Sequence, residues 1–302
     1  MRESPTLKQL NEAFGAEGAV VFREGRNGLP KVDLTSPGGW GAEVYLFGAT
    51  VTAWATPRGE NLLFLGKKAA FDGATPIIGG IPVIFPQFMN MGPCEFHGFA
   101  RRLTWDVAAA ARESNGDARV TLSLQDNEAT RSVWPFAFRL QCEVRLGGAL
   151  RCALRVANCG DAPFSFQTAL HSYFAVGDVR RTTVEGLQGL EYWLNRQRDV
   201  RARQTDSSVE FREFTSRTYF DAPGPIILTD RASGREMRVS RENLPDVVVW
   251  TPWSAQTNFF SLMAEDEYQC VVAVEPGAIR NPILLKPGEE WEGGQTLAMA
   301  FV

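Results

Sequence analysis

The sequence predicts an all-β protein, built as a large antiparallel β-sandwich or barrel with few short helices. Short runs of alternating apolar and polar residues recur along the chain, and Gly, Pro and Asn interrupt them. Helical periodicity is scarce, so no helix-length segment stands between the runs to carry a parallel crossover. We therefore expect mostly antiparallel strand and less than about 15% helix, well below the usual share.

The clearest element is a hairpin over residues 139–157. Apolar residues occupy every second position from 140 to 146, and the alternation resumes from 150 to 156 after the turn Gly147-Gly148-Ala149. Period-two patterning on both sides of a Gly-rich turn is typical of two antiparallel strands with one solvated face.

The remaining elements are weaker and are taken in chain order. Within an N-terminal segment, residues 1–17, the offsets of Leu7, Leu10 and Phe14 predict one short helix over 6–14. The polar stretch 186–216 is typical of a solvated loop, although its arginines, from Arg196 to Arg203, also leave a phosphate clamp open. Further strands are expected at 18–22, 42–47, 60–65, 118–124, 163–174, 225–229, 235–240, 246–251, 268–275 and 295–302.

Organisation and composition exclude several classes of protein. No linker, repeat or low-complexity run divides the chain, so residues 1–302 are expected to form one domain. With 44% hydrophobic and 22% charged residues the chain is neither disordered nor fibrous. No stretch approaches the roughly 18–20 apolar residues of a spanning helix. A net charge of −4 gives no field suited to nucleic acid, so we expect no nucleic-acid and no membrane partner.

Cysteine and histidine usage favours a metal-free protein. The five cysteines are scattered without CxxC spacing, and there are two histidines in the chain, so neither a disulfide framework nor a zinc site is indicated. The first residues lack the apolar stretch of a signal peptide. We expect a cytoplasmic protein, a monomer, without metal or other cofactor.

Three segments are dense in Gly, Pro, aromatic and ionisable residues and are candidates for chemistry. They are PIIGGIPVIFPQF at 76–88, which runs on to EFHGFAR at 95–101, ALHSYF at 169–174, and VVAVEPG at 271–277. A GxGxxG fingerprint and a GxSxG elbow are both missing, so neither a dinucleotide fold nor an α/β-hydrolase is supported.

Glu275 and His171 are candidates for a base and an acid. Glu275 ends an apolar run and precedes Pro276-Gly277, a position where desolvation can raise a carboxyl pKa toward neutrality. His171 stands in an aromatic strand and carries a proton readily near pH 7. Most strand-end glutamates merely face water, and many histidines in aromatic strands are hydrogen-bonded core residues, so neither position alone indicates catalysis.

Other polar and aromatic residues fit a carbohydrate ligand. His97 lies in a loop four residues before Arg101, which suits an anionic or polyhydroxyl ligand. Trp250 and Trp253 flank a Thr-Pro pair, and Phe85 and Phe88 flank Pro86. Flat rings beside polar groups suit the C–H faces of a sugar, although most such rings belong to the core.

Together these segments resemble the aldose 1-epimerase (mutarotase) superfamily, in its hexose-6-phosphate branch. The resemblance runs from about residue 30 to 300 and is closest to plant members related to apospory-associated proteins. It is carried by seven motifs in order: GGIP with FPQF, HGFAR, ALHSYF, VEGL at 184–187, PDVVVWTPW at 245–253, VEPG, and LKPGEEW at 285–291. It implies a galactose mutarotase-like β-sandwich with a sugar cleft.

The resemblance also implies roles for individual residues. His171 matches the general acid that protonates the ring oxygen, and Glu275 the general base that removes the proton of the C1 hydroxyl. His97 matches a histidine that contacts substrate and steadies developing charge, and Arg101 an arginine of the phosphate cluster. The expected substrate-binding positions are completed by Phe85, Gln87, Trp250 and Asp221.

Two positions depart from the family pattern. The family usually reads PIRGGIP, whose arginine binds phosphate, and Ile78 stands in its place. An acid that contacts sugar hydroxyls is replaced by Leu194, and Lys67, Lys68 or the arginines of 196–203 could compensate. The expected function is anomer interconversion of a hexose 6-phosphate. An unphosphorylated sugar, or a non-catalytic carbohydrate-binding or regulatory protein on the same fold, stays open.

Overall fold

Three antiparallel sheets make up the protein in the computed structural model, which describes residues 5–253 and 263–302. Strand makes up 50% of it and helix 9%, as the scarcity of helical periodicity predicts. A four-stranded sheet contains β1 (Val20–Glu24), β2 (Pro30–Thr35), β3 (Gly41–Tyr45) and β4 (Val51–Ala55) in chain order. In the described residues the two α-helices are α1 (Leu7–Phe14) and α2 (Glu128–Val133), and short 3₁₀ helices make up the rest of the helical residues.

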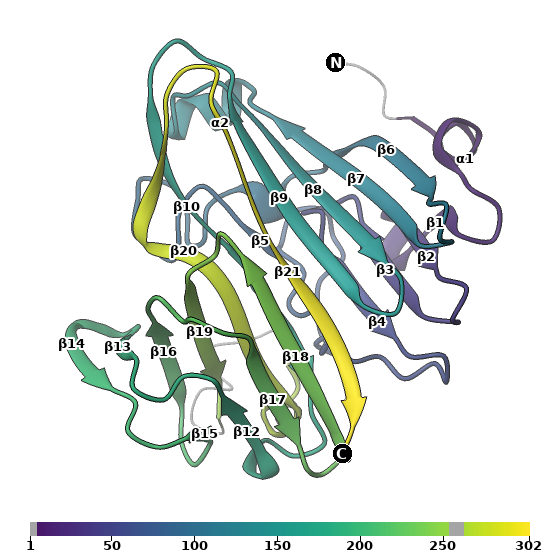
Figure 1. The fold of residues 1–302 in the computed structure, drawn as a ribbon. Coiled ribbons are helices and arrows are strands. Elements are labelled where there is room, and N and C mark those ends of the chain that lie inside the picture. Colours follow the sequence, from purple (N-terminus) through teal and green to yellow (C-terminus); the bar gives the residue numbers. More distant parts are fainter. Residues whose placement is uncertain (1–4, 254–262) are drawn as a thin grey trace.

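The other two sheets are larger (Figure 1). The eight-stranded sheet has the order β14 (Gln197–Arg203), β13 (Glu191–Leu194), β16 (Thr215–Tyr219), β19 (Asp246–Thr251), β20 (Val271–Leu285), β10 (Phe164–Leu170) and β5 (Val83–Ile84), and β11 (Tyr173–Ala175) also pairs with β20. The nine-stranded sheet has the order β15 (Ser208–Glu210), β12 (Thr182–Glu185), β17 (Ile226–Asp230), β18 (Arg235–Glu242), β21 (Glu290–Phe301), β9 (Leu150–Asn158), β8 (Phe138–Leu146), β7 (Ala118–Gln125) and β6 (Asp106–Arg112).

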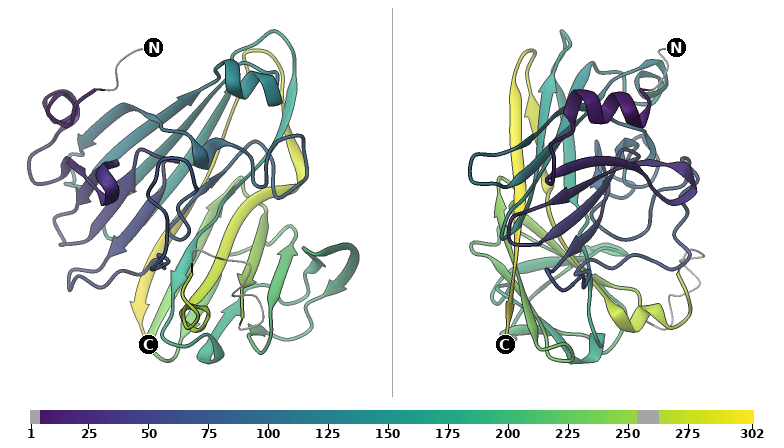
Figure 2. Two further views of the ribbon diagram at one scale, coloured as in Figure 1. Left: turned by 180° about the vertical axis from the view of Figure 1, so that it is seen from behind. Right: turned by 90° about the vertical axis from the view of Figure 1, so that its right-hand side faces the viewer.

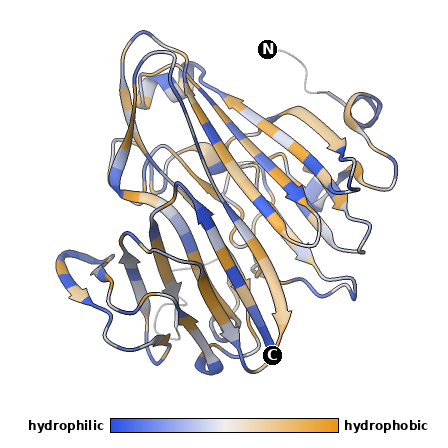
Figure 3. Cartoon of the chain, viewed as in Figure 1, coloured by the Kyte–Doolittle hydropathy of each residue, from blue (hydrophilic) through white to orange (hydrophobic). Residues whose placement is uncertain are grey.

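The main core lies between the nine-stranded sheet and the other two sheets. One continuous apolar cluster joins Val144 and Leu154 of the predicted hairpin to Trp54 of β4 and Val274 of β20. Figure 2 shows the nine-stranded sheet as an extended layer with the remaining elements packed beside it. Blue and orange alternate along β7 and β8 in Figure 3, because one face of each strand is buried and the other is partly exposed. The molecule is therefore a β-sandwich.

Local sequence explains the elements that were predicted. The hairpin over 139–157 is confirmed as β8 and β9, whose apolar positions are buried. The predicted N-terminal helix is α1, which begins after Thr6, where Thr6 and Gln9 form a reciprocal capping box. Residues 1–4 of the predicted N-terminal segment lie outside the described residues.

Three sequence expectations are corrected. The stretch 186–216 is not a loop, because it contains β13, β14, β15 and the start of β16. The side chains of β14 are all exposed, so this edge strand carries no apolar alternation to reveal it. The expected strand 60–65 makes only isolated bridges at Asn61, Leu63 and Leu65. The expected strand 163–174 is interrupted, since the chain leaves β10 before His171 and re-enters the sheet at Tyr173.

Candidate active site

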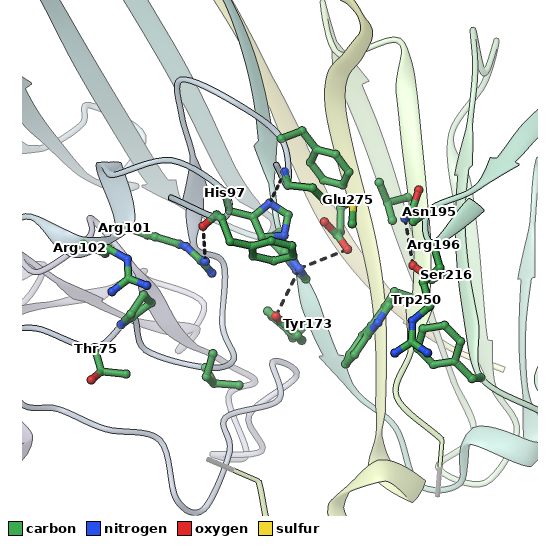
Figure 4. Close-up of a pocket in the computed structure, with 18 residues that line it drawn as sticks. Thr75, His97, Arg101, Arg102, Tyr173, Asn195, Arg196, Ser216, Trp250 and Glu275 are labelled. Atoms are coloured by element: carbon green, nitrogen blue, oxygen red, sulfur yellow. Dashed lines mark hydrogen bonds and ion pairs between the residues drawn. The ribbon is translucent and has the colours of Figure 1, made fainter. Parts of the chain in front are cut away.

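A pocket of about 340 Å³ opens on the face of the eight-stranded sheet that points away from the main core. Along β19 and β20, Val247, Val249 and Val274 belong to the main core, whereas Val248 and Glu275 line the pocket. This alternation arises because successive residues of a strand point to opposite faces of the sheet. Chain between residues 75 and 102 supplies the opposite wall, so the pocket lies between the sheet and a long irregular segment (Figure 4).

The sheet brings Glu275 and His171 together. Glu275 pairs in register with Val248 in the middle of the sheet, and His171 occupies the break between β10 and β11. The Nε2 atom of His171 lies 3.4 Å from Oε1 of Glu275, and the glutamate side chain is only 2% exposed. Among the described residues, the buried atoms Nδ1 of His171 and Oε2 of Glu275 have no hydrogen-bond partner. Unsatisfied buried polar atoms are rare in proteins and point to a ligand here.

Burial gives this pair its unusual electrostatics. Desolvation, and then the positive charge of Arg101, lower the pKa of His171 to about 3. Desolvation also raises the pKa of Glu275 well above its usual range, which Arg101 opposes in part. Both shifts favour the uncharged forms, a neutral His171 and a protonated Glu275. A carboxyl and an imidazole so arranged can exchange protons with a bound molecule at small cost.

His97 presents a fixed hydrogen-bond donor to the same pocket. Its backbone adopts a positive φ of 66°, and the Met89 N–H donates to its Nδ1 over 3.2 Å. Because Nδ1 accepts, the ring proton resides on Nε2. Burial, Arg101 and His171 hold the pKa of His97 well below its usual range, so the ring remains neutral. The two histidine rings lie edge to face with centroids 5.6 Å apart.

Arginines make the pocket cationic. Of the described residues that line it, Arg101, Arg102 and Arg196 are basic and Glu275 alone is acidic. In Figure 4, Arg101 and Arg102 stand on one side of Glu275 and Arg196 stands on the other. Arg101 is buried, donates from Nη2 to the Phe96 carbonyl over 2.8 Å, and has a pKa lowered to about 10 by burial. Such a lining favours an anionic ligand.

The structure places the other expected site residues as follows. Trp250 lines the pocket. Phe85 does not, since it is fully buried in an aromatic cluster with Trp134, Phe138 and Phe166. Gln87 and Asp221 also lie outside the lining. The Gln87 amide donates to the carbonyls of Met89 and Cys94. Oδ2 of Asp221 lies 3.7 Å from Nη1 of Arg280.

Of the two positions that depart from the family pattern, one lines the pocket and the other does not. Ile78 lines the pocket, so an apolar side chain occupies the wall where the family has an arginine. Leu194 does not line it, and the next residue, Asn195, does. The Asn195 amide donates to Ser216 Oγ over 3.0 Å, and both side chains are lining residues. Lys67 is paired with Asp266 instead, 3.3 Å away.

Sequence reasoning missed Tyr173, Arg102, Asn195 and Ser216. Tyr173 could have been found, because it lies two residues after His171 and so shares its side of a strand-like segment. Asn195 and Ser216 come from a stretch that looked like solvated loop, where no pattern indicated a pocket wall. Of the arginines from 196 to 203, only Arg196 is among the described lining residues.

Two further observations concern metals and membranes. Within residues 5–253 and 263–302, no three side chains of the His, Cys, Asp and Glu types gather as a metal site would need. The helices in those ranges are too short or too polar for any of them to cross a bilayer.

The fold and the pocket together define a β-sandwich with a buried acid–base pair in a cationic pocket. The sequence model of the family described as aldose 1-epimerase matches residues 30–298. The chain therefore belongs to the aldose 1-epimerase family and is an epimerase.

Individual relatives agree with this assignment. A protein of Cenchrus ciliaris, named "putative glucose-6-phosphate 1-epimerase", is 37% identical over 275 residues, which cover 88% of this chain and 84% of the relative. A protein of the same name from Escherichia coli K12 is 30% identical, with 78% of each chain covered. The crystal structure of a "putative mutarotase" from Salmonella typhimurium superposes with a TM-score of 0.86, at 26% identity and 94% coverage of each chain. A galactose mutarotase-like protein from Clostridium acetobutylicum shares the fold, with a TM-score of 0.75 at 16% identity.

Proposed function

We propose that this protein interconverts the α and β anomers of a hexose 6-phosphate, with His171 and Glu275 as the acid–base pair. The observation that carries the choice of substrate is the charge of the pocket, in which three arginines accompany the acid–base pair. The names of the plant and bacterial relatives support the same substrate.

The chemistry needs one proton held by the pair. With that proton on His171 and Glu275 ionised, Nε2–H protonates the ring oxygen and the bond between that oxygen and C1 breaks. The C1 hydroxyl gives its proton to Glu275, and the electron pair of its O–H bond becomes part of the C1=O bond. Rotation about the C1–C2 bond and the reverse transfers close the ring on the other face of the aldehyde. The pair thus ends each turnover with the proton where it began.

Burial favours the protonation state of the open-chain stage. A neutral His171 and a protonated Glu275 are the forms left after ring opening. Burial therefore favours the uncharged pair of the open-chain stage over the charged pair that starts ring opening. The Nε2–H group of His97 is available to the developing carbonyl oxygen as a donor that does not titrate near neutrality.

Anomer exchange measured side by side on glucose 6-phosphate and glucose tests the proposal. Because a charge-assisted hydrogen bond contributes on the order of 1.5–3 kcal/mol, we expect kcat/KM to favour the phosphate roughly ten- to a hundred-fold. Arg196→Gln should lower that preference, whereas Arg198→Gln is a matched control, since Arg198 is exposed on β14 and does not line the pocket.

A second candidate substrate, an unphosphorylated sugar, is favoured by Ile78 alone. An isoleucine offers no donor to a phosphate and leaves an apolar wall at this place. Equal kcat/KM values for the two sugars would select this candidate over the phosphate. Calorimetric binding of either sugar without any acceleration of anomer exchange would instead identify a carbohydrate-binding protein that has lost turnover.

A further inference from the structure

Tyr173 touches the proposed acid with both its hydroxyl and its ring. It is the first residue of β11, is 4% exposed and lines the pocket. Its hydroxyl lies 3.3 Å from Nε2 of His171, and the two rings stack with centroids 4.2 Å apart and planes 11° apart. The ring of Trp250 packs nearly perpendicular to the tyrosine ring, with centroids 5.9 Å apart. Figure 4 shows the Tyr173 hydroxyl directed at the centre of the pocket.

The direction of this contact depends on which nitrogen of His171 carries the ring proton. A buried hydroxyl needs an acceptor, and within the described part of the chain the Tyr173 hydroxyl has one polar contact, Nε2 of His171. If Nε2 carried the ring proton, that hydroxyl would have no acceptor among the described residues. In the Nδ1–H tautomer Nε2 accepts from Tyr173, and the Nδ1–H group, which has no partner among the described residues, is available to a ligand. Burial raises the pKa of the Tyr173 hydroxyl, so it remains a donor across the working range of pH.

We propose that Tyr173 is a positioning residue that donates to Nε2 of His171, stabilises the neutral imidazole and so strengthens His171 as the acid of ring opening. The inference rests on the proposed anomerase function and adds a residue to it. The stacked Tyr173 ring restricts rotation of the His171 imidazole. The Tyr173 hydroxyl keeps Nε2 directed into the pocket as the nitrogen that gives and later regains the proton. When Nε2 has passed its proton to the ring oxygen, the Tyr173 hydroxyl donates to the emptied lone pair.

The other charged and titratable groups that face this contact come from three elements. Glu275 reaches Nε2 from β20, Arg101 acts on His171 from the turn that contains it, and His97 approaches from the loop before that turn. Arg101 disfavours a protonated His171, as Tyr173 does, whereas an ionised Glu275 favours it. Loss of the tyrosine hydroxyl should therefore leave His171 easier to protonate, with the other three groups unchanged.

Tyr173→Phe tests the proposal because it keeps the stacked ring and removes only the hydroxyl. We expect kcat for anomer exchange to fall about ten- to a hundred-fold, with KM changed less than about threefold, as for a group whose effect is confined to the reacting state. The acid limb of the kcat/KM profile should move to higher pH, since a second proton then binds the pair more readily. The alkaline limb should stay in place, because it reports loss of the proton from Glu275.

Tyr45→Phe is the matched control. Tyr45 is also a buried tyrosine with one hydroxyl contact, to the Arg26 N–H over 2.9 Å, but it is outside the pocket lining. This variant should keep the native kcat and pH profile. A Tyr173→Phe enzyme with native kcat and an unmoved acid limb would overturn the proposal. Loss of activity with a lowered Tm and an unmoved acid limb would also overturn it, because a packing role explains that result.

A spectroscopic test separates this proposal from the proposed function. The chain has two histidines, so ¹⁵N labelling of histidine gives signals from two rings only. We expect His171 to show the Nδ1–H tautomer and His97 the Nε2–H tautomer, and His97→Asn assigns the pair. In Tyr173→Phe the His171 signals should shift toward the other tautomer. Unchanged signals would refute the role of Tyr173 even in an active enzyme, whereas a native protein that does not accelerate anomer exchange would refute the function alone.

Discussion

Burial shifts the pKa values of several residues in this pocket but does not neutralise all of them. Glu275 and His171 lose most of their hydration, and each pKa moves in the direction that removes charge. Arg101 is also buried and its pKa falls to about 10, yet it remains charged near neutrality. It is thus the fixed charge of the site, and it acts on His97, His171 and Glu275 together. His171 and Glu275 therefore exchange protons beside the constant positive charge of Arg101.

The acid–base assignment predicts the effect of conservative replacements. His171→Asn and Glu275→Gln should each lower the rate of anomer exchange by about 10²–10⁴-fold, the usual contribution of a positioned acid or base. Both replacements keep the approximate volume and polarity of the side chain, so circular dichroism should match the native protein. Near-native turnover in either variant would remove that residue from the mechanism.

The elements explain why the pocket wall opposite the sheet is irregular but well defined. Chain from Phe85 to Gly98 makes no helix and only an isolated bridge, and Met89, His97 and Gly98 have positive φ values of 48°, 66° and 71°. At Gly98 a side chain could not be accommodated, because a Cβ atom would lie 2.1 Å from the Phe85 carbonyl oxygen. Gln87 connects the two ends of this loop, since its side-chain oxygen accepts from Cys94 N–H over 2.7 Å and its amide nitrogen donates to the carbonyls of Met89, Cys94 and Glu95.

We therefore expect Gln87→Ala to act on substrate binding through the loop. All four hydrogen bonds of the buried Gln87 amide disappear. Each buried backbone group left without a partner costs about 1–3 kcal/mol where no water replaces the amide. Because the loop carries His97, KM should rise severalfold while the pH profile keeps its shape. The Gln87→Glu variant keeps the oxygen that accepts from Cys94 N–H and loses the donor to the carbonyls. Gln167→Ala is not a suitable control, because the Gln167 side chain accepts from Phe88 N–H and so also positions the loop. A Gln87→Ala enzyme with native KM and native Tm would contradict the interpretation.

At the scale of the elements, the hydropathy pattern predicts a strand where one face of that strand is buried and fails to predict it elsewhere. The hairpin of β8 and β9 is readable because its alternating positions face the main core. Strand β14 is invisible to hydropathy because both of its faces are exposed. The break at His171 is hidden for the opposite reason, since residues on both sides of it are buried and look like one strand.

The whole molecule explains which parts of the site could be predicted. His171, Glu275, His97 and Arg101 were predicted from motifs, and all four line one pocket although they are far apart in the sequence. The eight-stranded sheet positions Glu275 and His171, and the irregular segment opposite positions His97 and Arg101. Asn195 and Ser216 could not be found in this way. They become neighbours only because β13 and β16 pair at one edge of the eight-stranded sheet, a long-range contact that no local pattern encodes.

Burial of both histidines makes the stability of the whole molecule depend on pH. His97 and His171 are neutral in the folded protein, with pKa values below the usual 6.5, whereas in the unfolded chain they take up protons near that value. Below pH 6.5 the unfolded state thus binds more protons, and stability falls as the pH falls. The pKa of Glu275 is raised, so above its usual 4.5 the folded state holds a proton that the unfolded state has lost, and stability falls as the pH rises.

These opposite slopes can be separated by denaturant unfolding of variants. Each fully titrating group contributes about 1.4 kcal/mol per pH unit to the slope. Between pH 5 and 6, His97→Asn and His171→Asn should each reduce the acid-side loss of unfolding free energy by up to about that amount per unit. Above pH 4.5, Glu275→Gln should flatten the loss of unfolding free energy that accompanies rising pH, because the variant has no carboxyl to titrate. Slopes identical to the native protein in all three variants would mean that these groups titrate normally in the folded state. In that case the neutral resting pair, on which the proton accounting of the active site depends, would be wrong.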